Sequence, residues 1–145
     1  MDASLIRILM LDDDEDECVM TRALLSSIQS ARFELDWVSN YEVALSTMER
    51  KQYDLYLFDH QLGARTGLEL LRQVNQRGNL VPVILFTGHD DHETDVEAMK
   101  AGASKYLTKP FDLEELKLAI DTALQSSGMA PEVERLRHDL EAEYD

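Results

Sequence analysis

The sequence has few cysteines, few basic residues and no long apolar run. Cys18 is its one cysteine, so no disulfide can form within the chain, and we expect a core or boundary thiol without a redox role. Lys and Arg together number 14 against 29 Asp and Glu, which gives a formal net charge of −15. This charge repels phosphate backbones and acidic membrane surfaces. Direct binding to nucleic acid is therefore not expected.

Membrane spans and export signals are also missing from the sequence. No apolar stretch approaches the roughly 20 residues that cross a bilayer, and residues 1–4 lack the basic start of a secretory signal. We therefore expect no membrane association and a cytoplasmic location. The chain of 145 residues is 44% apolar, enough for a packed core without metals or disulfides, and its length favours one domain.

Short apolar runs alternate with segments of helical spacing as far as residue 127. The runs predict strands over residues 5–11, 33–38, 55–58, 81–86 and 104–107. The helical spacing predicts helices over residues 15–29, 41–50, 66–76, 91–101 and 113–124. The connections look too short for further structure. Five such units predict a doubly wound α/β fold with a five-stranded parallel sheet in the flavodoxin-like order 2-1-3-4-5.

Residues with special backbone or capping properties stand at the ends of several predicted elements. Asn40 is a plausible cap for the helix over 41–50. Gly78 closes the third strand–helix unit, and Gly102 stops the fourth helix. Pro82 is tolerable near the start of its strand, where a missing N–H costs least.

The composition shifts around residues 126–128. Pro131 can begin another helix, whose apolar positions follow i, i+3, i+7 spacing. These positions are Val133, Leu136 and Leu140. We expect residues 1–127 to form the domain and 128–145 a helical tail. The tail is either a frayed terminal helix or the start of a coiled-coil linker to a downstream domain or a second subunit.

Chemically active side chains follow four of the five predicted strands. Asp12 and Asp13 follow the first, Asp59 the third, Thr87 the fourth and Lys109 the fifth. Because the carboxyl ends of parallel strands share one edge of a sheet, where α/β folds bind ligands, these side chains should converge.

Asp12 opens a run of six consecutive acids that ends at Glu17. Acids at the start of a helix favour its positive end, and this effect together with solvation accounts for residues 14–17. It does not account for Asp12 and Asp13. Two unit charges about 4 Å apart repel by about 1 kcal/mol in water and about 4 kcal/mol at a semi-buried site, and Asp59 would add a third. An all-oxygen site of this kind suits Mg²⁺.

A carboxylate at the end of a buried strand can attack phosphorus to form an acyl phosphate. Lys109 can give a point-charge contact to the phosphoryl group, and the Thr87 hydroxyl can donate a hydrogen bond to it. Taken singly, a strand-end Thr is usually a turn residue and a lone Lys is usually surface. Their arrival at successive strand ends beside the acids is what points to a phosphoryl site.

The chain resembles the receiver domains of two-component response regulators over about residues 4–127. The matching segments are residues 8–14, 57–59 with Gly67 eight residues on, 85–88, 97–103 and 106–111. The resemblance implies that Asp59 accepts phosphate from a phosphohistidine of a sensor histidine kinase or histidine phosphotransfer protein. It also implies that Asp12, Asp13, Asp59 and the main-chain carbonyl of Gln61 hold Mg²⁺.

The same resemblance implies a switch and an output. Thr87 and Lys109 would contact the phosphoryl group, and Tyr106 would turn inward when Thr87 moves, altering the surface of the fourth helix, fifth strand and fifth helix. Gln61 and His89 resemble positions that tune the lifetime of the acyl phosphate. The output would be a downstream protein or a fused output domain, with a homodimer through the tail as a further possibility.

Two other functions fit parts of the pattern. In a haloacid-dehalogenase-type phosphatase Asp12 would be the nucleophile, and Asp14 completes its Asp-x-Asp spacing, but Asp16 stands where that family has Thr or Val, no cap domain is inserted, and Asp59 has no role. A phosphorylation-independent adaptor usually loses one acid or the lysine. We predict a signalling module that phosphorylates and dephosphorylates itself and is not otherwise an enzyme.

Overall fold

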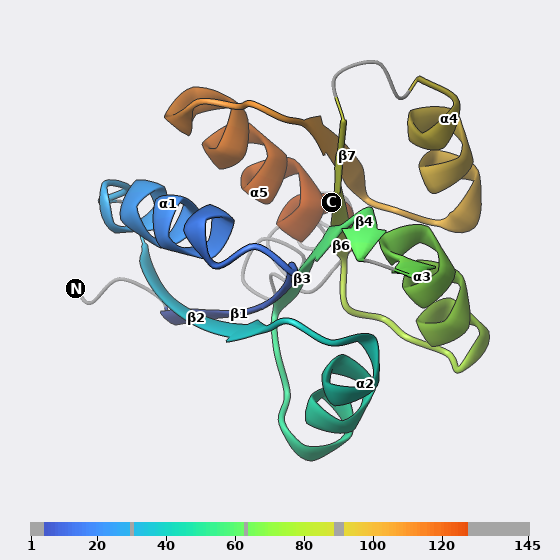
Figure 1. Ribbon diagram of the computed structural model, residues 1–145. Helices are drawn as coiled ribbons and strands as arrows, with labels where there is room; N and C mark the ends of the chain where they lie inside the picture. Colours follow the sequence, from blue (N-terminus) through green and yellow to red (C-terminus); the bar gives the residue numbers. More distant parts are fainter. Residues whose placement is uncertain (1–4, 30, 63, 89–91, 128–145) are drawn as a thin grey trace, which may run out of the picture.

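The computed structural model describes residues 5–29, 31–62, 64–88 and 92–127. In these residues, one five-stranded sheet is covered by helices on both faces (Figure 1). The strands of this sheet are β1 (Leu5–Leu11), β2 (Arg32–Val38), β3 (Leu55–Asp59), β6 (Val83–Thr87) and β7 (Lys105–Thr108). The helices are α1 (Glu15–Ser26), α2 (Tyr41–Arg50), α3 (Gly67–Gln76), α4 (His92–Ala101) and α5 (Leu113–Ser127).

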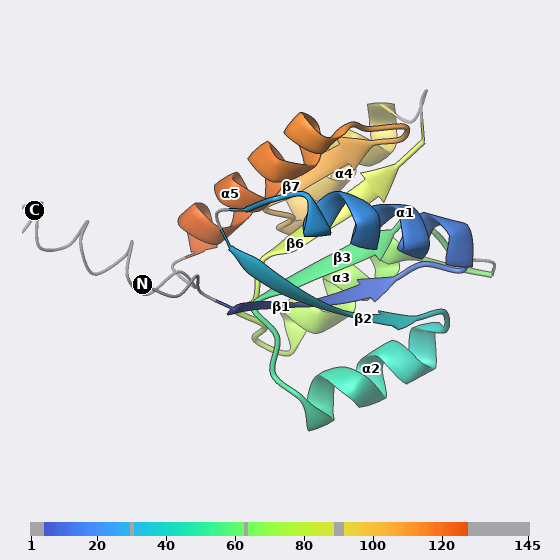
Figure 2. The same ribbon diagram turned by 90° about the vertical axis from the view of Figure 1, so that its left-hand side faces the viewer.

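The strand order is β2-β1-β3-β6-β7, and every neighbouring pair is parallel. Since β6 and β7 are the fourth and fifth predicted strands, the predicted order 2-1-3-4-5 is confirmed. Figure 2 shows α1 and α5 together on one side of the sheet and α2 on the other. The chain therefore winds helices onto both faces, as the alternation of strands and helices predicted.

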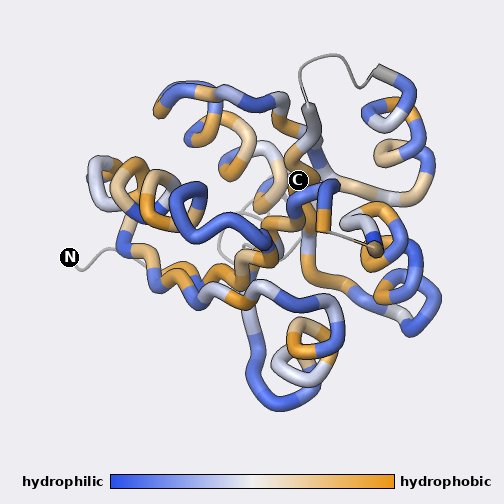
Figure 3. The backbone as a smooth tube through the Cα atoms, in the orientation of Figure 1, coloured by the Kyte–Doolittle hydropathy of each residue, from blue (hydrophilic) through white to orange (hydrophobic). Residues whose placement is uncertain are grey.

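Each face of the sheet has its own hydrophobic core because successive strand residues point to opposite sides. From β1, Ile8 and Met10 pack with α1 and α5, whereas Leu9 and Leu11 pack with α2, α3 and α4. Figure 3 shows the hydrophobic residues gathered along the strands. Cys18 of α1 is buried in the first of these cores, as expected for a core thiol, and burial raises the pKa of its thiol.

The helix ends have the predicted chemistry. The side chain of Asn40 accepts hydrogen bonds from the N–H groups of Glu42 and Val43, which confirms it as the cap of α2. Gly78 and Gly102 have positive φ angles of 85° and 106°, the left-handed backbone that glycine adopts without a Cβ clash.

Some element boundaries differ from the prediction. The expectation that the connections hold no further structure is wrong, because β4 (Gln61–Leu62) and β5 (Arg65–Thr66) pair as a small antiparallel hairpin between β3 and α3. Helix α1 ends at Ser26 instead of residue 29. Strand β6 begins at Val83, directly after Pro82, which has no N–H to donate.

Two further predictions concern the C-terminal tail and membrane-spanning helices. The predicted tail, residues 128–145, lies outside the described residues, so its helix and its role stay predictions. Within the described ranges, none of the helices has the length and apolar character that a bilayer crossing requires.

Candidate phosphoryl and metal site

The carboxyl edge of the sheet brings Asp12, Asp59 and Lys109 together. Strand register places Leu11 beside Phe58, so the acids that follow these residues are neighbours. The Nζ atom of Lys109 donates a hydrogen bond to Oδ1 of Asp59 at 2.9 Å and lies 3.6 Å from Oδ2 of Asp12. Asp12 is fully buried and Asp59 nearly so. The predicted convergence of acids and ammonium is therefore present in the structure.

Asp12, Asp13 and Asp59 form a group, here named the carboxylate cluster, in which one oxygen from each residue lies within 4.8 Å of the other two. Asp13 is exposed, which leaves the cluster open to solvent on one side. Oδ1 of Asp12 accepts the N–H of Asp14 at 2.9 Å, but the buried Oδ2 has no hydrogen-bond partner among the described residues. A buried oxygen without a donor and an all-carboxylate donor set fit a hard divalent cation such as Mg²⁺.

The charge balance of the site agrees with this fit. Burial raises the pKa of Asp12 to about 7, and the charge of Asp59 adds to the rise, although the hydrogen bond from the Asp14 N–H opposes it. Burial lowers the pKa of Lys109, but its hydrogen bond to Asp59 and the surrounding carboxylates outweigh burial, so this pKa lies above its usual range. Lys109 is therefore positively charged at neutral pH, whereas the ionised form of Asp12 needs further positive charge beside it.

Glu17 also lies at the site: it is in the first turn of α1, as the interpretation of a helix-start acid has it, but its side chain is only partly solvated. Its Oε1 atom is buried and lies 3.7 Å from Nζ of Lys109. Glu17 precedes the buried Thr21 by one turn of α1, which places both on the side of the helix that faces the sheet. The four-residue spacing between Glu17 and Thr21 is the sequence signal that could have indicated this position.

Thr87 ends β6 at the same edge, where its hydroxyl donates a hydrogen bond to Oδ1 of Asp95 at 2.7 Å. Both side chains are buried, and Asp95 comes from α4. Asp95 was missed in the sequence, where it is one acid among several on an amphipathic helix. Tyr106 is half-buried in β7, in register with Leu85, and its predicted inward turn stays a prediction.

The hairpin β4-β5 follows Asp59, the predicted phosphate acceptor, and backbone hydrogen bonds hold the residues at its two ends. The N–H of His60 donates to the carbonyl of Phe86, and the N–H of Gly67 donates to the carbonyl of His60. Gln61 lies in β4 with an exposed side chain, and its carbonyl remains a predicted metal ligand. His89 lies outside the described residues, so its predicted effect on lifetime stays a prediction.

Gly67 and Trp37 support the backbone of the two buried acids. A Cβ on Gly67 would collide with the main-chain oxygen of Asp59 and lie 2.9 Å from Cδ1 of Leu85, so only glycine fits there. The indole Nε1 of Trp37 donates to the main-chain oxygen of Asp12 at 2.8 Å. The absence of a side chain at Gly67 lets the main chain pack closely against Asp59, and the Trp37 hydrogen bond fixes the main chain of Asp12.

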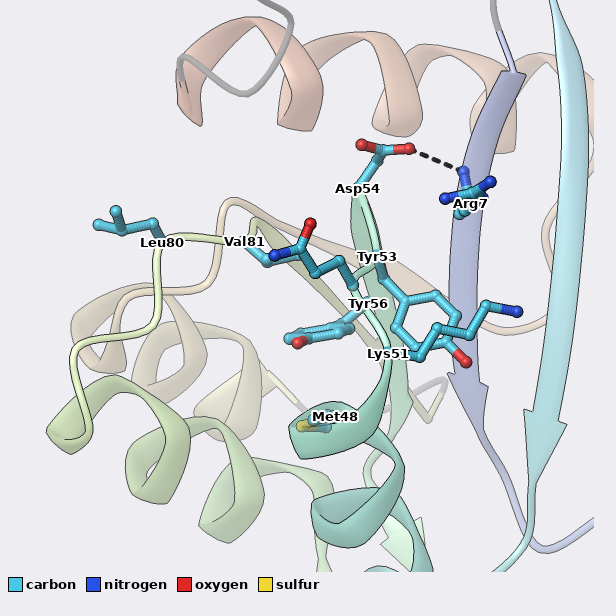
Figure 4. Close-up of a pocket in the computed structure, with 9 residues that line it drawn as sticks. Arg7, Met48, Lys51, Tyr53, Asp54, Tyr56, Leu80 and Val81 are labelled. Carbon is cyan, nitrogen blue, oxygen red and sulfur yellow. Dashed lines mark hydrogen bonds between the residues drawn. The ribbon is translucent and has the colours of Figure 1, made fainter.

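A pocket of about 440 Å³ lies at the opposite edge, around the starts of β1, β3 and β6. Figure 4 shows Met48, Tyr53 and Tyr56 along its wall and a hydrogen bond from the N–H of Arg7 to Asp54. Its basic side chains, Arg7 and Lys51, form ion pairs with acids of β2. The sequence predicted no site here, and its two basic side chains already have acidic partners.

Comparison with known proteins agrees with this geometry. The sequence profile of the response regulator receiver domain matches residues 8–121. The chain belongs to the response regulator receiver family. This confirms the resemblance drawn from the sequence, and the chain is a receiver domain of the kind found in two-component systems.

Similar proteins include both curated regulators and solved structures. The regulatory protein AtoC of Escherichia coli is 33% identical over 95% of this chain and 29% of its own length. The response regulator TodT of Pseudomonas putida is 35% identical over 93% of this chain and 60% of its own length. A crystal structure of NtrX from Brucella abortus aligns with a TM-score of 0.78 at 29% identity, over 92% of this chain and 30% of NtrX.

The receiver domain of NtrX alone aligns with a TM-score of 0.73 at 28% identity, over 83% of this chain and 99% of that domain. The chain thus spans from under a third to about 60% of the length of the curated relatives described above.

Receiver domains generally bind Mg²⁺, and the carboxylate cluster is a group of acids that can hold such an ion.

Proposed function

We propose that Asp59 accepts a phosphoryl group from a phosphohistidine and that the chain is the phosphorylated switch of a two-component relay. The observation that carries this proposal is the 2.9 Å hydrogen bond from Lys109 Nζ to Asp59 Oδ1 beside two further acids. A strand-end carboxylate held against a fixed ammonium can attack phosphorus while the ammonium stays beside the phosphoryl oxygens.

In the proposed reaction, a carboxylate oxygen of Asp59 forms a bond to phosphorus as the bond from phosphorus to the donor histidine nitrogen breaks. The electron pair of that bond leaves with the imidazole. Lys109 balances charge on the phosphoryl oxygens, and the Thr87 hydroxyl donates a hydrogen bond to one of them. Later attack by water releases inorganic phosphate and restores the carboxylate. No external metabolite is turned over.

Asp12, Asp13, Asp59 and the main-chain carbonyl of Gln61 are the proposed holders of Mg²⁺. When bound, this ion neutralises part of the charge on the phosphoryl oxygens. Oδ2 of buried Asp12, which has no hydrogen-bond partner among the described residues, supports this assignment.

The proposed signal passes from Thr87 through Tyr106 to the face formed by α4, β7 and α5. We propose that Gln61 and His89 set how long the acyl phosphate lasts.

The proposed partners are a sensor histidine kinase or a histidine phosphotransfer protein, and a downstream protein or fused output domain. A homodimer through residues 128–145 is part of the same proposal, as is a cytoplasmic location.

Phosphorylation by a small donor tests the assignment of Asp59. The chain is incubated with acetyl phosphate and Mg²⁺, and its intact mass is measured. We expect the gain of one phosphoryl group, and no gain in Asp59→Asn or after chelation of Mg²⁺. Asp54→Asn is a matched control, because it makes the same change at the other end of β3, where Asp54 accepts the N–H of Arg7.

Two results would contradict the proposal. A phosphoryl group that persists in Asp59→Asn would remove Asp59 as the acceptor. Recovery of the label on Asp12 after peptide mapping would instead favour the phosphatase chemistry in which Asp12 is the nucleophile.

A further inference from the structure

We propose that Asp95 is a positioning residue that withholds the Thr87 hydroxyl from the phosphoryl site until Asp59 is modified. The inference rests on the proposed function of Asp59 and adds a residue that acts through Thr87. Its basis is the buried hydrogen bond of 2.7 Å from Thr87 Oγ1 to Asp95 Oδ1, which joins the end of β6 to α4.

The hydroxyl of Thr87 has one proton to donate. A phosphoryl group offers only acceptor oxygens, so Thr87 must point that proton at the group to stabilise it. In the structure, the proton is directed at Asp95, which is also only an acceptor when ionised. The two acceptors therefore compete for one donor, and Thr87 has a latched state on Asp95 and an engaged state on the phosphoryl group.

The position of Asp95 distinguishes this latch from the ordinary preference of acids for a helix start. Glu93 also lies in the first turn of α4, but its side chain is exposed, whereas Asp95 is buried. Within the described residues, the Thr87 hydroxyl donates a hydrogen bond to the Asp95 carboxylate, and no Lys or Arg forms an ion pair with it. Leaving the latched state deprives a buried acceptor of its hydrogen bond.

The latch also links the phosphoryl site to α4. Asp95 is held by Thr87 on one side of the helix, and Ala98, one turn later, is buried against the sheet. When Thr87 turns to the phosphoryl group, α4 loses this contact with β6. The proposed signal thus reaches α4 directly, in addition to any movement of Tyr106 in β7.

The test measures the equilibrium affinity for beryllium trifluoride, which places three acceptor fluorines where the phosphoryl oxygens would be. The apparent affinity of a protein falls with the fraction of molecules in the binding-competent state. A hydrogen bond to a charged group is worth roughly a factor of ten or more in such an equilibrium. With saturating Mg²⁺, we therefore expect Asp95→Ala to bind about tenfold more tightly than the wild type, and Asp95→Asn by less, because the amide keeps a neutral acceptor.

A double-mutant cycle with Thr87→Val separates the latch from a general structural role. In the Thr87→Val background no hydroxyl is left to compete for, so Asp95→Ala should leave the affinity unchanged. Glu93→Ala is the matched control for loss of one negative charge from the same turn of α4, and it should bind like the wild type. If Asp95→Ala does not fold in a urea titration, Asp95→Asn takes its place in the cycle.

The outcomes keep this inference apart from the proposed function. If the wild type does not bind the fluoride, or binds it equally well as Asp59→Asn, the proposed function fails. If the wild type binds through Asp59 but neither Asp95 variant binds more tightly, only the latch is overturned. The latch is also overturned if the gain in affinity persists in the Thr87→Val background or appears in Glu93→Ala.

Discussion

Both edges of the sheet carry ion pairs, but the two edges hold them in different surroundings. At the amino edge, Lys51 pairs with Asp36 at 2.8 Å, and their side chains are 41% and 37% exposed. At the carboxyl edge, Lys109 is 23% exposed and faces Asp12 and Asp59, which are 0% and 7% exposed. Lys109 thus pairs with two buried acids, whereas Lys51 pairs with one half-exposed acid.

The difference separates charge that stabilises little from charge that is available for chemistry. Exposed ion pairs contribute roughly 0 to 1 kcal/mol, because water and salt screen them. Buried acids that share one cation keep unmatched negative charge, which a divalent metal ion can neutralise. The hydrogen bonds from Lys51 and Tyr53 lower the pKa of Asp36, whereas burial raises that of Asp12. The pKa values of Asp36 and Asp12 are thus shifted in opposite directions.

Removing a lysine from each edge should show the largest contrast. Lys109→Ala takes away the ammonium beside Asp59, and loss of one such electrostatic contact costs roughly 100-fold in rate. We expect the rate of labelling by acetyl phosphate to fall by about that factor. Lys51→Ala should leave the rate unchanged and lower the free energy of unfolding by less than about 1 kcal/mol. Equal rates for the two variants would erase the contrast between the edges.

A methyl group placed behind Asp59 should distort the site from within the core. In Gly67→Ala the new Cβ collides with the main-chain oxygen of Asp59, so we expect the free energy of unfolding to fall by roughly 1–3 kcal/mol, as measured in urea. Gly88→Ala is the control, because its Cβ would meet no atom within 4 Å. Equal stability of the two variants would mean that the backbone near Gly67 moves aside freely.

The affinity for Mg²⁺ should depend on pH through Asp12. Mg²⁺ requires the ionised carboxylate, and the pKa of Asp12 is raised to about 7. By calorimetry, affinity should rise by up to about tenfold per pH unit below 7 and level off above it. Without metal, the folded state holds this proton more tightly than the unfolded chain, so the free energy of unfolding should fall as pH rises from about 4 to 7. An affinity that is flat from pH 5 to 8 would contradict the shift.

The smallest expected effect concerns Glu17. Its charge contributes to the raised pKa of Asp12, as the last of the causes that act on this group. Glu17→Gln should therefore move the midpoint of the Mg²⁺ profile to lower pH by a fraction of a unit. Glu15→Gln, an exposed neighbour in the same turn of α1, should leave the midpoint in place. A shift in the opposite direction would show that Glu17 acts on the site in some other way.

Much of the fold and of the site could be predicted because both depend on strand ends. The bounds of β1 and α2 match the prediction, and the cap Asn40 was predicted from the sequence alone. Once the sheet is parallel, the residues that follow its strands must share an edge, and this rule alone predicted that Asp12, Asp59 and Lys109 lie together.

The features that the sequence did not predict depend on short pairings or on which elements pack against a residue. The spacing of residues in the sequence does not give this information. Strands β4 and β5 are two residues each, too short for an alternating pattern to show. Glu17 and Asp95 lie on helices rich in exposed acids, and only the placement of those helices over the edge buries Asp95 and one oxygen of Glu17. The role of Tyr106 and the residues from 128 onward stay predictions.

The chain contains a single tryptophan, and its indole is hydrogen-bonded to the backbone of Asp12. Its tryptophan fluorescence therefore comes from one position, next to Asp12 and the carboxylate cluster. Emission from Trp37 should report occupancy of the site in the unlabelled protein, with no other indole to dilute the signal. The residue that braces the site is thus also its optical probe.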